Sequence, residues 1–86
     1  MKLSKKIKVK NELGLHTRPA TQIVKLLQKY QSSVYFTYKK DTINARSIMS
    51  ILILAVEKNS QITITVEGED ASLVMDNLLQ FFEQGS

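Results

Sequence analysis

The chain contains no cysteine and no tryptophan, and it has one histidine, one proline and three glycines among its 86 residues. Without cysteine, neither disulfide bonds nor cysteine-ligated metal can hold the fold, and we expect a reducing, cytoplasmic environment. A single histidine with scattered carboxylates makes a poor zinc site, so we expect no metal. The same scarcity leaves no nucleophile–base pair, which argues against a free-standing enzyme.

Long apolar runs are also absent. The longest run covers residues 51–56, far short of the roughly 20 residues that span a bilayer. Residues 1–6 carry three lysines but no apolar run after them, so they do not resemble a signal peptide. We therefore expect no membrane insertion.

Acidic residues are fewer than basic ones, at 8 against 12, and the formal net charge is +4. Five lysines fall within the first ten residues. Such a run can attract an acidic partner or nucleic acid. It can equally form the solvated face of a strand, because Lys8 and Lys10 alternate with Ile7 and Val9. We favour the second interpretation and expect no nucleic-acid partner, since no gathering of aromatic and basic residues on one face is evident.

Alternation of apolar and polar residues predicts four strands, at residues 7–10, 34–38, 43–45 and 61–67. A helical period predicts two helices, one from Ala20 to about Tyr30 and one after Asp70, which is a plausible helix cap. The segment 47–56 is apolar on every side, so it could be a strand, or a short helix with Ser47 as its N-cap. The chain is short enough for one domain. The pattern predicts an α+β fold in which helices pack on one face of a sheet.

The stretch Gly-Leu-His-Thr-Arg-Pro-Ala at residues 14–20 stands where the first helix begins. Gly14 permits a sharp turn, and Pro19 costs no hydrogen bond in a first helical turn. Free N–H groups near Thr17 and Arg18 form an anion site at the positive end of the helix dipole. Arg18 adds paired donors suited to phosphate oxygens.

His16 places a nucleophilic nitrogen beside this cradle, and an imidazole is largely neutral near pH 7. The arrangement predicts a side chain that accepts a phosphoryl group and passes it on. The plainer interpretation, a surface or capping histidine, remains open on chemistry alone.

Two segments resemble the HPr family, the histidine-containing phosphocarriers of the bacterial phosphoenolpyruvate-dependent sugar phosphotransferase system. One is residues 14–20, and the other is Ala-Arg-Ser-Ile-Met at residues 45–49, which is similar to the family's regulatory serine segment. The resemblance covers nearly the whole chain and implies one HPr-like phosphocarrier domain over residues 1–86. It also implies an open-faced β-sandwich of order βαββαβα, with a four-stranded antiparallel sheet, three helices on one face and a short helix beginning near Ser47.

Carried over by position, the resemblance makes His16 the phosphoryl acceptor and Arg18 a phosphate contact, aided by backbone N–H groups of Thr17 and Arg18. Gly14 and Pro19 would shape the site. Enzyme I, which uses phosphoenolpyruvate and Mg²⁺, would phosphorylate His16, and the A domains of sugar permeases would receive the group. The chain itself would bind no cofactor and would be a cytoplasmic monomer.

The resemblance also makes Ser47 the target of an HPr kinase/phosphorylase, although a serine here could act only as a helix cap. Phosphate at Ser47 would place negative charge beside an apolar surface for partner proteins. The residues expected on that surface are Thr17, Ala20, Arg46, Ser47, Ile48, Met49, Ile51 and Leu52.

The sequence departs from the family pattern at several positions. Leu13 replaces a residue that is often Asn or Ser, and Ser50, Ala55 and Asn59 stand where many members have glycine. The predicted turn at residues 38–41 also lacks the usual Asn-Gly. These departures keep the acceptor and the arginine, so they indicate altered partners rather than altered chemistry. A regulatory paralogue, acting in a nitrogen-linked phosphorelay or as an adaptor, is the alternative.

Overall fold

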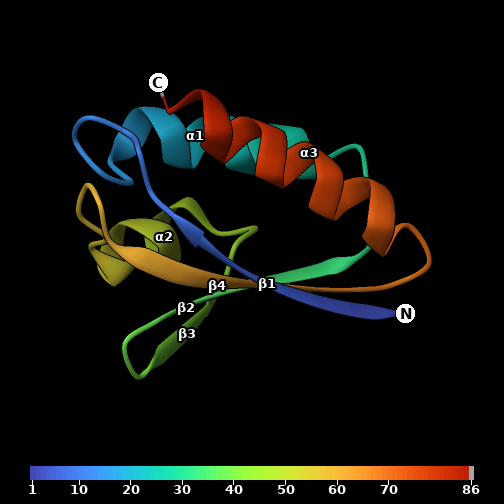
Figure 1. The fold of residues 1–86 in the computed structure, drawn as a ribbon. Coiled ribbons are helices and arrows are strands. Elements are labelled where there is room, and N and C mark those ends of the chain that lie inside the picture. The colour runs from blue at the N-terminus through green and yellow to red at the C-terminus, as the bar shows by residue number, and fades with distance from the viewer. Residues whose placement is uncertain (86) are drawn as a thin grey trace.

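In the computed structural model, which describes residues 1–85, the chain folds into a sheet covered by helices (Figure 1). The elements, in chain order, are β1 (Lys2–Lys8), α1 (Thr17–Leu27), β2 (Ser33–Tyr38), β3 (Asp41–Asn44), α2 (Ile48–Leu54), β4 (Gln61–Glu67) and α3 (Ala71–Gln84). The predicted order βαββαβα is confirmed.

The four strands form one antiparallel sheet in the order β1-β4-β2-β3, so β1 and β3 are its edges. Figure 1 shows the three helices on the same side of this sheet, leaving the other face open. This is the expected open-faced sandwich. Within residues 1–85, no helix has both the length and the apolar character needed to cross a membrane.

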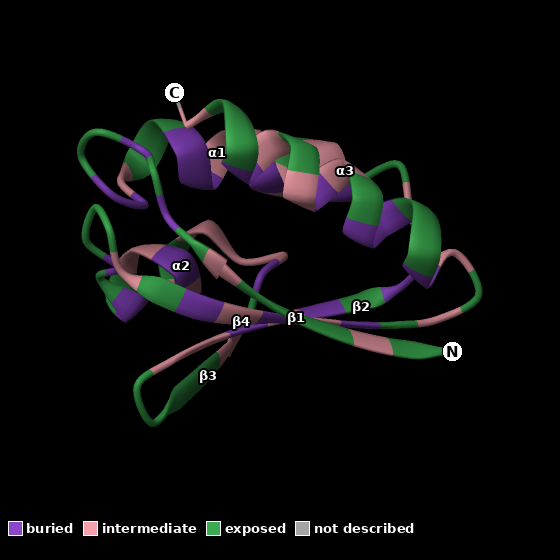
Figure 2. Cartoon of the chain, viewed as in Figure 1, coloured by how far each residue is buried: buried purple, intermediate pink, exposed green. Residues whose placement is uncertain are grey.

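The core fills the space between the helices and the covered face of the sheet (Figure 2). The strands contribute inward side chains such as Phe36 and Ile64, both fully buried, because alternate residues of a strand point to one face. The ring of Phe36 meets that of Phe82 on α3 edge-to-face, with centroids 5.8 Å apart. Such apolar burial is the main stabilising contribution in a domain of this size.

The first strand begins earlier than its apolar pattern predicts. We expected residues 7–10, but β1 spans Lys2–Lys8. The inward positions are Leu3, Lys5 and Ile7, which lie opposite Val66, Ile64 and Ile62 of β4. Lys5 interrupts the alternation, and an edge strand tolerates it because its side chain reaches solvent.

The β2–β3 hairpin is tighter than expected, because β3 begins at Asp41 rather than at Ile43. Lys39 and Lys40 alone connect the strands, and Lys39 has a φ of 58°. A positive φ at the first of two loop residues is typical of a type II′ turn, in which glycine usually stands there. The lysine adopts it without glycine's freedom, and its Nζ lies 5.2 Å from the centre of the Tyr38 ring.

The ambiguous segment is a helix, α2. Ser47 is its N-cap, and the Ser47 hydroxyl accepts a hydrogen bond from the backbone N–H of Ser50 at 3.1 Å. The helix ends at Ala55, whose φ of 55° is left-handed. Asn59 also has a positive φ, of 71°. Two of the departures from the family's glycines therefore occupy backbone conformations that glycine adopts with least strain.

Candidate functional site

The loop before α1 is held against the connection between α2 and β4. The N–H of Leu15 donates to the carbonyl oxygen of Val56 at 3.0 Å. The N–H of Gly14 donates to the carbonyl oxygen of Asn11, also at 3.0 Å. Gly14 has a φ of 69°, and a Cβ at this position would collide with the Val56 carbonyl oxygen. Glycine is thus required here by both conformation and space.

His16 is the N-cap of α1. Its backbone is extended, with φ −81° and ψ −170°, and its carbonyl oxygen accepts the first helical hydrogen bond from Ala20 N–H at 3.0 Å. The His16 side chain makes no capping bond and is partly exposed. The capping interpretation of the imidazole is therefore wrong, and the partly exposed ring is not held by a capping hydrogen bond.

The first turn of α1 supplies donors next to this ring. The first N–H groups of a helix lack acceptors within it, and at this terminus they belong to Thr17 and Arg18, since Pro19 has none. Thr17 and Arg18 are exposed, whereas Pro19 is buried and fixes the turn. Within residues 1–85, Arg18 makes no ion pair. The first turn therefore holds two free amides and an exposed arginine close in sequence to the imidazole, and these are groups that can bind an anion.

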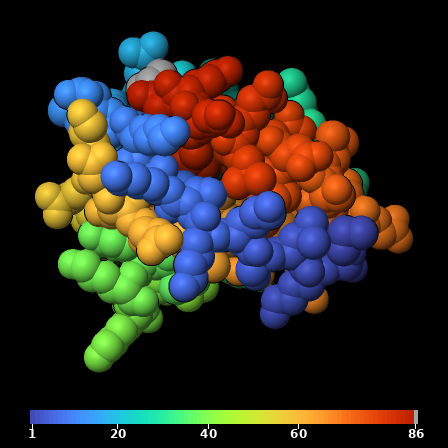
Figure 3. All heavy atoms as spheres, in the orientation of Figure 1, coloured from blue at the N-terminus to red at the C-terminus, as the bar shows by residue number. Residues whose placement is uncertain are grey.

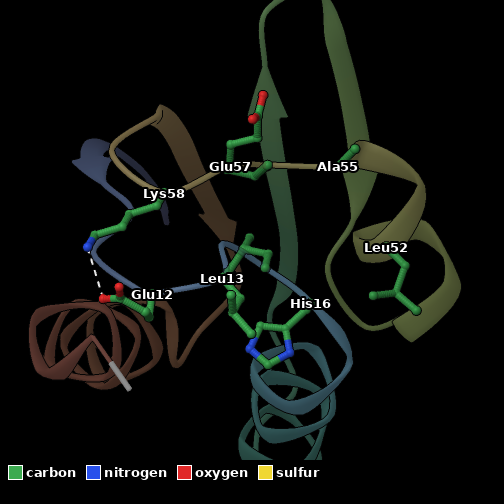
Figure 4. A pocket seen from close by; sticks show the side chains of 9 residues that line it. Glu12, Leu13, His16, Leu52, Ala55, Glu57 and Lys58 are labelled. Carbon is green, nitrogen blue, oxygen red and sulfur yellow. Dashed lines mark hydrogen bonds and ion pairs between the residues drawn. The ribbon is translucent and has the colours of Figure 1, made fainter.

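A surface pocket of about 510 Å³ adjoins His16 (Figure 4). It lies between the loop before α1 and the α2–β4 connection, and Leu13, Leu52 and Ala55 are among its lining residues. Lys58 Nζ and Glu12 Oε2, 2.9 Å apart, form an ion pair across the two loops. Figure 4 shows the His16 ring at the start of α1, with Leu13 from its own loop and Leu52 from α2 beside the same opening.

Arg46 and Ser47 are consecutive in the chain, but their side chains make different contacts. The Ser47 hydroxyl caps α2, and the residue is partly exposed. The Arg46 guanidinium is turned into the molecule, where it donates to three carbonyl oxygens, those of Leu27, Tyr30 and Ser32, each at 2.8 Å. Arg46 therefore fastens the end of α1 and the following loop.

The expected partner surface needs correction at Ala20 and Ile51, and the guanidinium of Arg46 also lies inward rather than on that surface. Ala20 and Ile51 are 0% exposed, because both point into the core between helices and sheet. They cannot contact a partner. Thr17, Ile48, Met49 and Leu52 do reach the surface, and Met49 is 66% exposed.

Two other large apolar side chains that are exposed, one before α1 and one on α2, were not included in that prediction. Leu13 is 74% exposed and Ile53 is 73% exposed. Ile53 lies one helical turn after Met49, so the 3.6-residue period could have placed it on the exposed face of α2. Leu13 had no such signal, because a loop has no period.

Within residues 1–85, no group of three histidine or acidic side chains is placed to hold a metal ion.

The chain is similar to known phosphocarriers along most of its length. Residues 3–84 match the family model described as the PTS HPr component phosphorylation site. The phosphocarrier protein HPr of Chlamydia muridarum is 44% identical over 77 residues, which is 90% of this chain and 74% of that protein. The solved HPr of Thermoanaerobacter tengcongensis superposes with a TM-score of 0.92 at 30% identity, covering 96% of this chain and 93% of that one. The HPr of Bacillus anthracis gives 0.89 at 33% identity, covering 94% and 96%.

Two further solved relatives differ in assembly or role. One is described as an HPr dimer from T. tengcongensis, with a TM-score of 0.76, 32% identity and coverage of 91% and 90%. The other is Crh, described as the catabolite repression HPr of Bacillus subtilis, with a TM-score of 0.67, 29% identity and coverage of 93% and 95%. The family model and the curated relatives each cover most of the chain. This chain belongs to the HPr family of phosphocarrier proteins.

Proposed function

We propose that His16 carries a phosphoryl group from phosphorylated enzyme I to the A domains of sugar permeases. The observation that carries the proposal is the position of the imidazole at the N-cap of α1. There it makes no capping bond and lies next to the amides of Thr17 and Arg18. An accessible nucleophile and a set of anion donors converge at one helix terminus.

In the first step, one unprotonated nitrogen of His16 attacks phosphorus. A phosphorus–nitrogen bond forms as the bond from phosphorus to its donor atom on enzyme I breaks, and the other ring nitrogen keeps its proton. The amides and the Arg18 guanidinium bind the phosphoryl oxygens, whose charge is highest during transfer. In the second step, a nucleophile of the A domain attacks phosphorus and the bond to His16 breaks. Phosphoenolpyruvate and Mg²⁺ act on enzyme I, so this chain needs no cofactor.

The test is the intact mass of the protein after incubation with enzyme I, Mg²⁺ and phosphoenolpyruvate. We expect one added, acid-labile phosphate on the wild type and none on His16→Ala, because no other side chain at the site is a nucleophile of this kind. Lys29→Ala is the control, because Lys29 is exposed and lies just after the end of α1, away from His16. This variant should be phosphorylated normally. A phosphorylated His16→Ala protein would refute the assignment.

We also propose that phosphorylation of Ser47 by an HPr kinase/phosphorylase weakens transfer from enzyme I. Ser47 precedes Ile48 and Met49 on the surface beside the His16 site, so a phosphate there would add charge to an apolar contact. We expect Ser47→Asp to slow phosphorylation of His16, whereas Ser72→Asp, an exposed serine on α3, should not. Equal transfer rates for Ser47→Asp and the wild type would contradict this regulation.

The second candidate is a regulatory paralogue, and the likeness to Crh favours it. A paralogue of this kind, in a nitrogen-linked phosphorelay or as an adaptor, would not serve sugar uptake. Phosphate transfer from His16 to a permease A domain distinguishes the two, because only the carrier requires it. If the biological output survives His16→Ala, the adaptor role replaces the carrier role. We expect a cytoplasmic monomer in either case, and light scattering would reveal a dimer such as the one from T. tengcongensis.

A further inference from the structure

Among residues 1–85, no strand pairs with the outer edge of β1. Sheet order places β1 at an edge, paired only with β4. At its ends, the Gly68 N–H donates to the Met1 carbonyl oxygen at 2.9 Å, and the Val9 N–H donates to that of Ser60 at 2.8 Å. Antiparallel strands alternate, so the odd residues of β1 face β4. The N–H and C=O groups of Ser4, Lys6 and Lys8 therefore point outward.

A basic groove runs beside this edge, between β1 and α3. Its volume is about 370 Å³, and it is lined by Lys5, Lys6, Ile7, Lys8, Lys10, Leu79, Phe82 and Glu83. It shares no residue with the pocket at His16. Figure 3 shows this side of the molecule, with the first residues of the chain exposed along the sheet edge below α3.

The charges of the groove are almost all of one sign. Four of its residues are lysines and one is acidic. Within residues 1–85, Lys5, Lys6 and Lys8 form no ion pair, since the one ion pair joins Lys58 to Glu12. Two copies of β1 placed edge to edge would bring lysines together, which disfavours self-pairing. The edge is thus complementary to an acidic chain and not to itself.

We propose that the β1 edge binds an extended acidic segment of another protein, which adds a fifth strand to the sheet. The free groups of Ser4, Lys6 and Lys8 would make the backbone hydrogen bonds. On the open face, acidic side chains of the segment would lie beside Lys6 and Lys8. On the helix face, its apolar side chains would cover Ile7, Leu79 and Phe82. The preferred partner sequence therefore alternates acidic and apolar residues.

A nucleic acid is the less suitable occupant of the same groove. Single strands bind through aromatic side chains on which bases stack. Phe82 is the one aromatic residue lining the groove, and it is 2% exposed. The alternation of apolar and cationic positions favours a peptide strand.

The test is amide hydrogen exchange, measured by NMR on the full chain, with a capped peptide of alternating Glu and Val, about six residues long. We expect the amides of Ser4, Lys6 and Lys8 to exchange more slowly when the peptide is present. Leu3, Lys5 and Ile7, whose amides already face β4, should change little. A peptide with Lys in place of Glu, and one with its Glu and Val segregated into two blocks, are the controls and should give no protection.

Two variants separate charge from backbone. Lys6→Gln together with Lys8→Gln keeps both amides, and should weaken peptide binding by roughly tenfold at low salt with a smaller salt dependence. Lys6→Pro removes an outward N–H without removing a bond to β4, and should abolish the protection at Ser4 and Lys8. If Lys6→Pro does not fold, the proposal still requires that the double glutamine variant bind the peptide roughly tenfold more weakly than the wild type.

The proposal is overturned if the Glu-Val peptide protects none of the three amides at millimolar concentration, in which case the lysines only prevent edge pairing. It is also overturned if the Lys-Val peptide binds equally well. A single-stranded oligonucleotide that binds more tightly than the peptide, without protecting these amides, would replace it with nucleic-acid binding.

Discussion

At the scale of single residues, Arg18 has no structural role within the described part of the chain. Its side chain is exposed and makes no ion pair within residues 1–85. Arg18 lies in the first turn of α1, two residues after His16, and under the proposed function its guanidinium would supply counter-charge to a phosphoryl group on the imidazole. Function and stability can therefore be separated at this residue.

We predict that Arg18→Ala slows phosphoryl transfer by roughly 100-fold, the usual loss for one donor to a developing anion. The free energy of unfolding should change by no more than about 0.5 kcal/mol, as for other exposed substitutions. Rapid-quench kinetics with phosphorylated enzyme I measures the first effect and urea unfolding the second. Lys25→Ala, also exposed on α1, serves as the control. An Arg18→Ala protein that unfolds would show a structural role instead.

At the scale of elements, α1 is fastened at both ends by contacts distant in sequence. Its N-terminal loop is bonded to the α2–β4 connection through Leu15 and Val56. Its C-terminal end, and the loop after it, are bonded by the guanidinium of Arg46. Carbonyl groups at the end of a helix have no partners within it, so a cation that binds several of them stabilises the termination. The orientation of the helix that carries His16 depends on both attachments.

We predict that Arg46→Met lowers the free energy of unfolding by about 2–3 kcal/mol, because it leaves three partly buried carbonyl oxygens without their charged donor. Urea unfolding followed by circular dichroism measures the change. Arg18→Met is the matched control, because within residues 1–85 this arginine bonds no carbonyl, and the change should be nearly neutral. If both variants are equally stable, the contacts of Arg46 contribute nothing net, and its guanidinium would be available to partners.

At the scale of the whole molecule, Asp70 joins two loops that lie far apart in the chain. It is the N-cap of α3, as predicted, but its carboxylate makes no capping bond. Instead it accepts hydrogen bonds from the hydroxyl and N–H of Ser32 and from the N–H of Gln31. The hydroxyl of Ser32, followed by the N–H of Gln31, lowers the pKa of the Asp70 carboxyl. The charged form of this side chain is therefore favoured by the fold.

Because the pKa is lower in the folded state, the contribution of Asp70 to stability is present above the ordinary carboxyl value of about 3.9. It is lost as the pH falls through the lowered folded value. We predict that Asp70→Asn makes the free energy of unfolding less dependent on pH below about pH 4. Urea titrations across that range measure the slope. Asp76→Asn, exposed on α3, is the control, and an Asp70→Asn slope as steep as the wild type would contradict the prediction.

Local signals were sufficient for most of the architecture and for the centre of the site. Helices and strands with one clean apolar face, such as α3 and β4, were predicted because burial of one face imposes its period on the sequence. His16, Thr17 and Arg18 were predicted to lie together because they are consecutive at a helix start. The start of β1 was missed because Lys5 occupies an inward position, which only an exposed sheet edge allows.

The sequence pattern by itself determined the order of the elements except at residues 47–56, and it placed His16, Thr17 and Arg18 together at a helix start, because each of these features depends on residues within a turn or two of one another. Only the tertiary structure decided the rest. It buried Ala20 and Ile51, exposed Leu13, and turned Arg46 toward carbonyls 14 to 19 residues away. In the described part of the chain, it also left the outward amides of β1 without a partner strand. These features arise from which elements pack together, and a period or a motif carries no information about a neighbour that is distant in the chain.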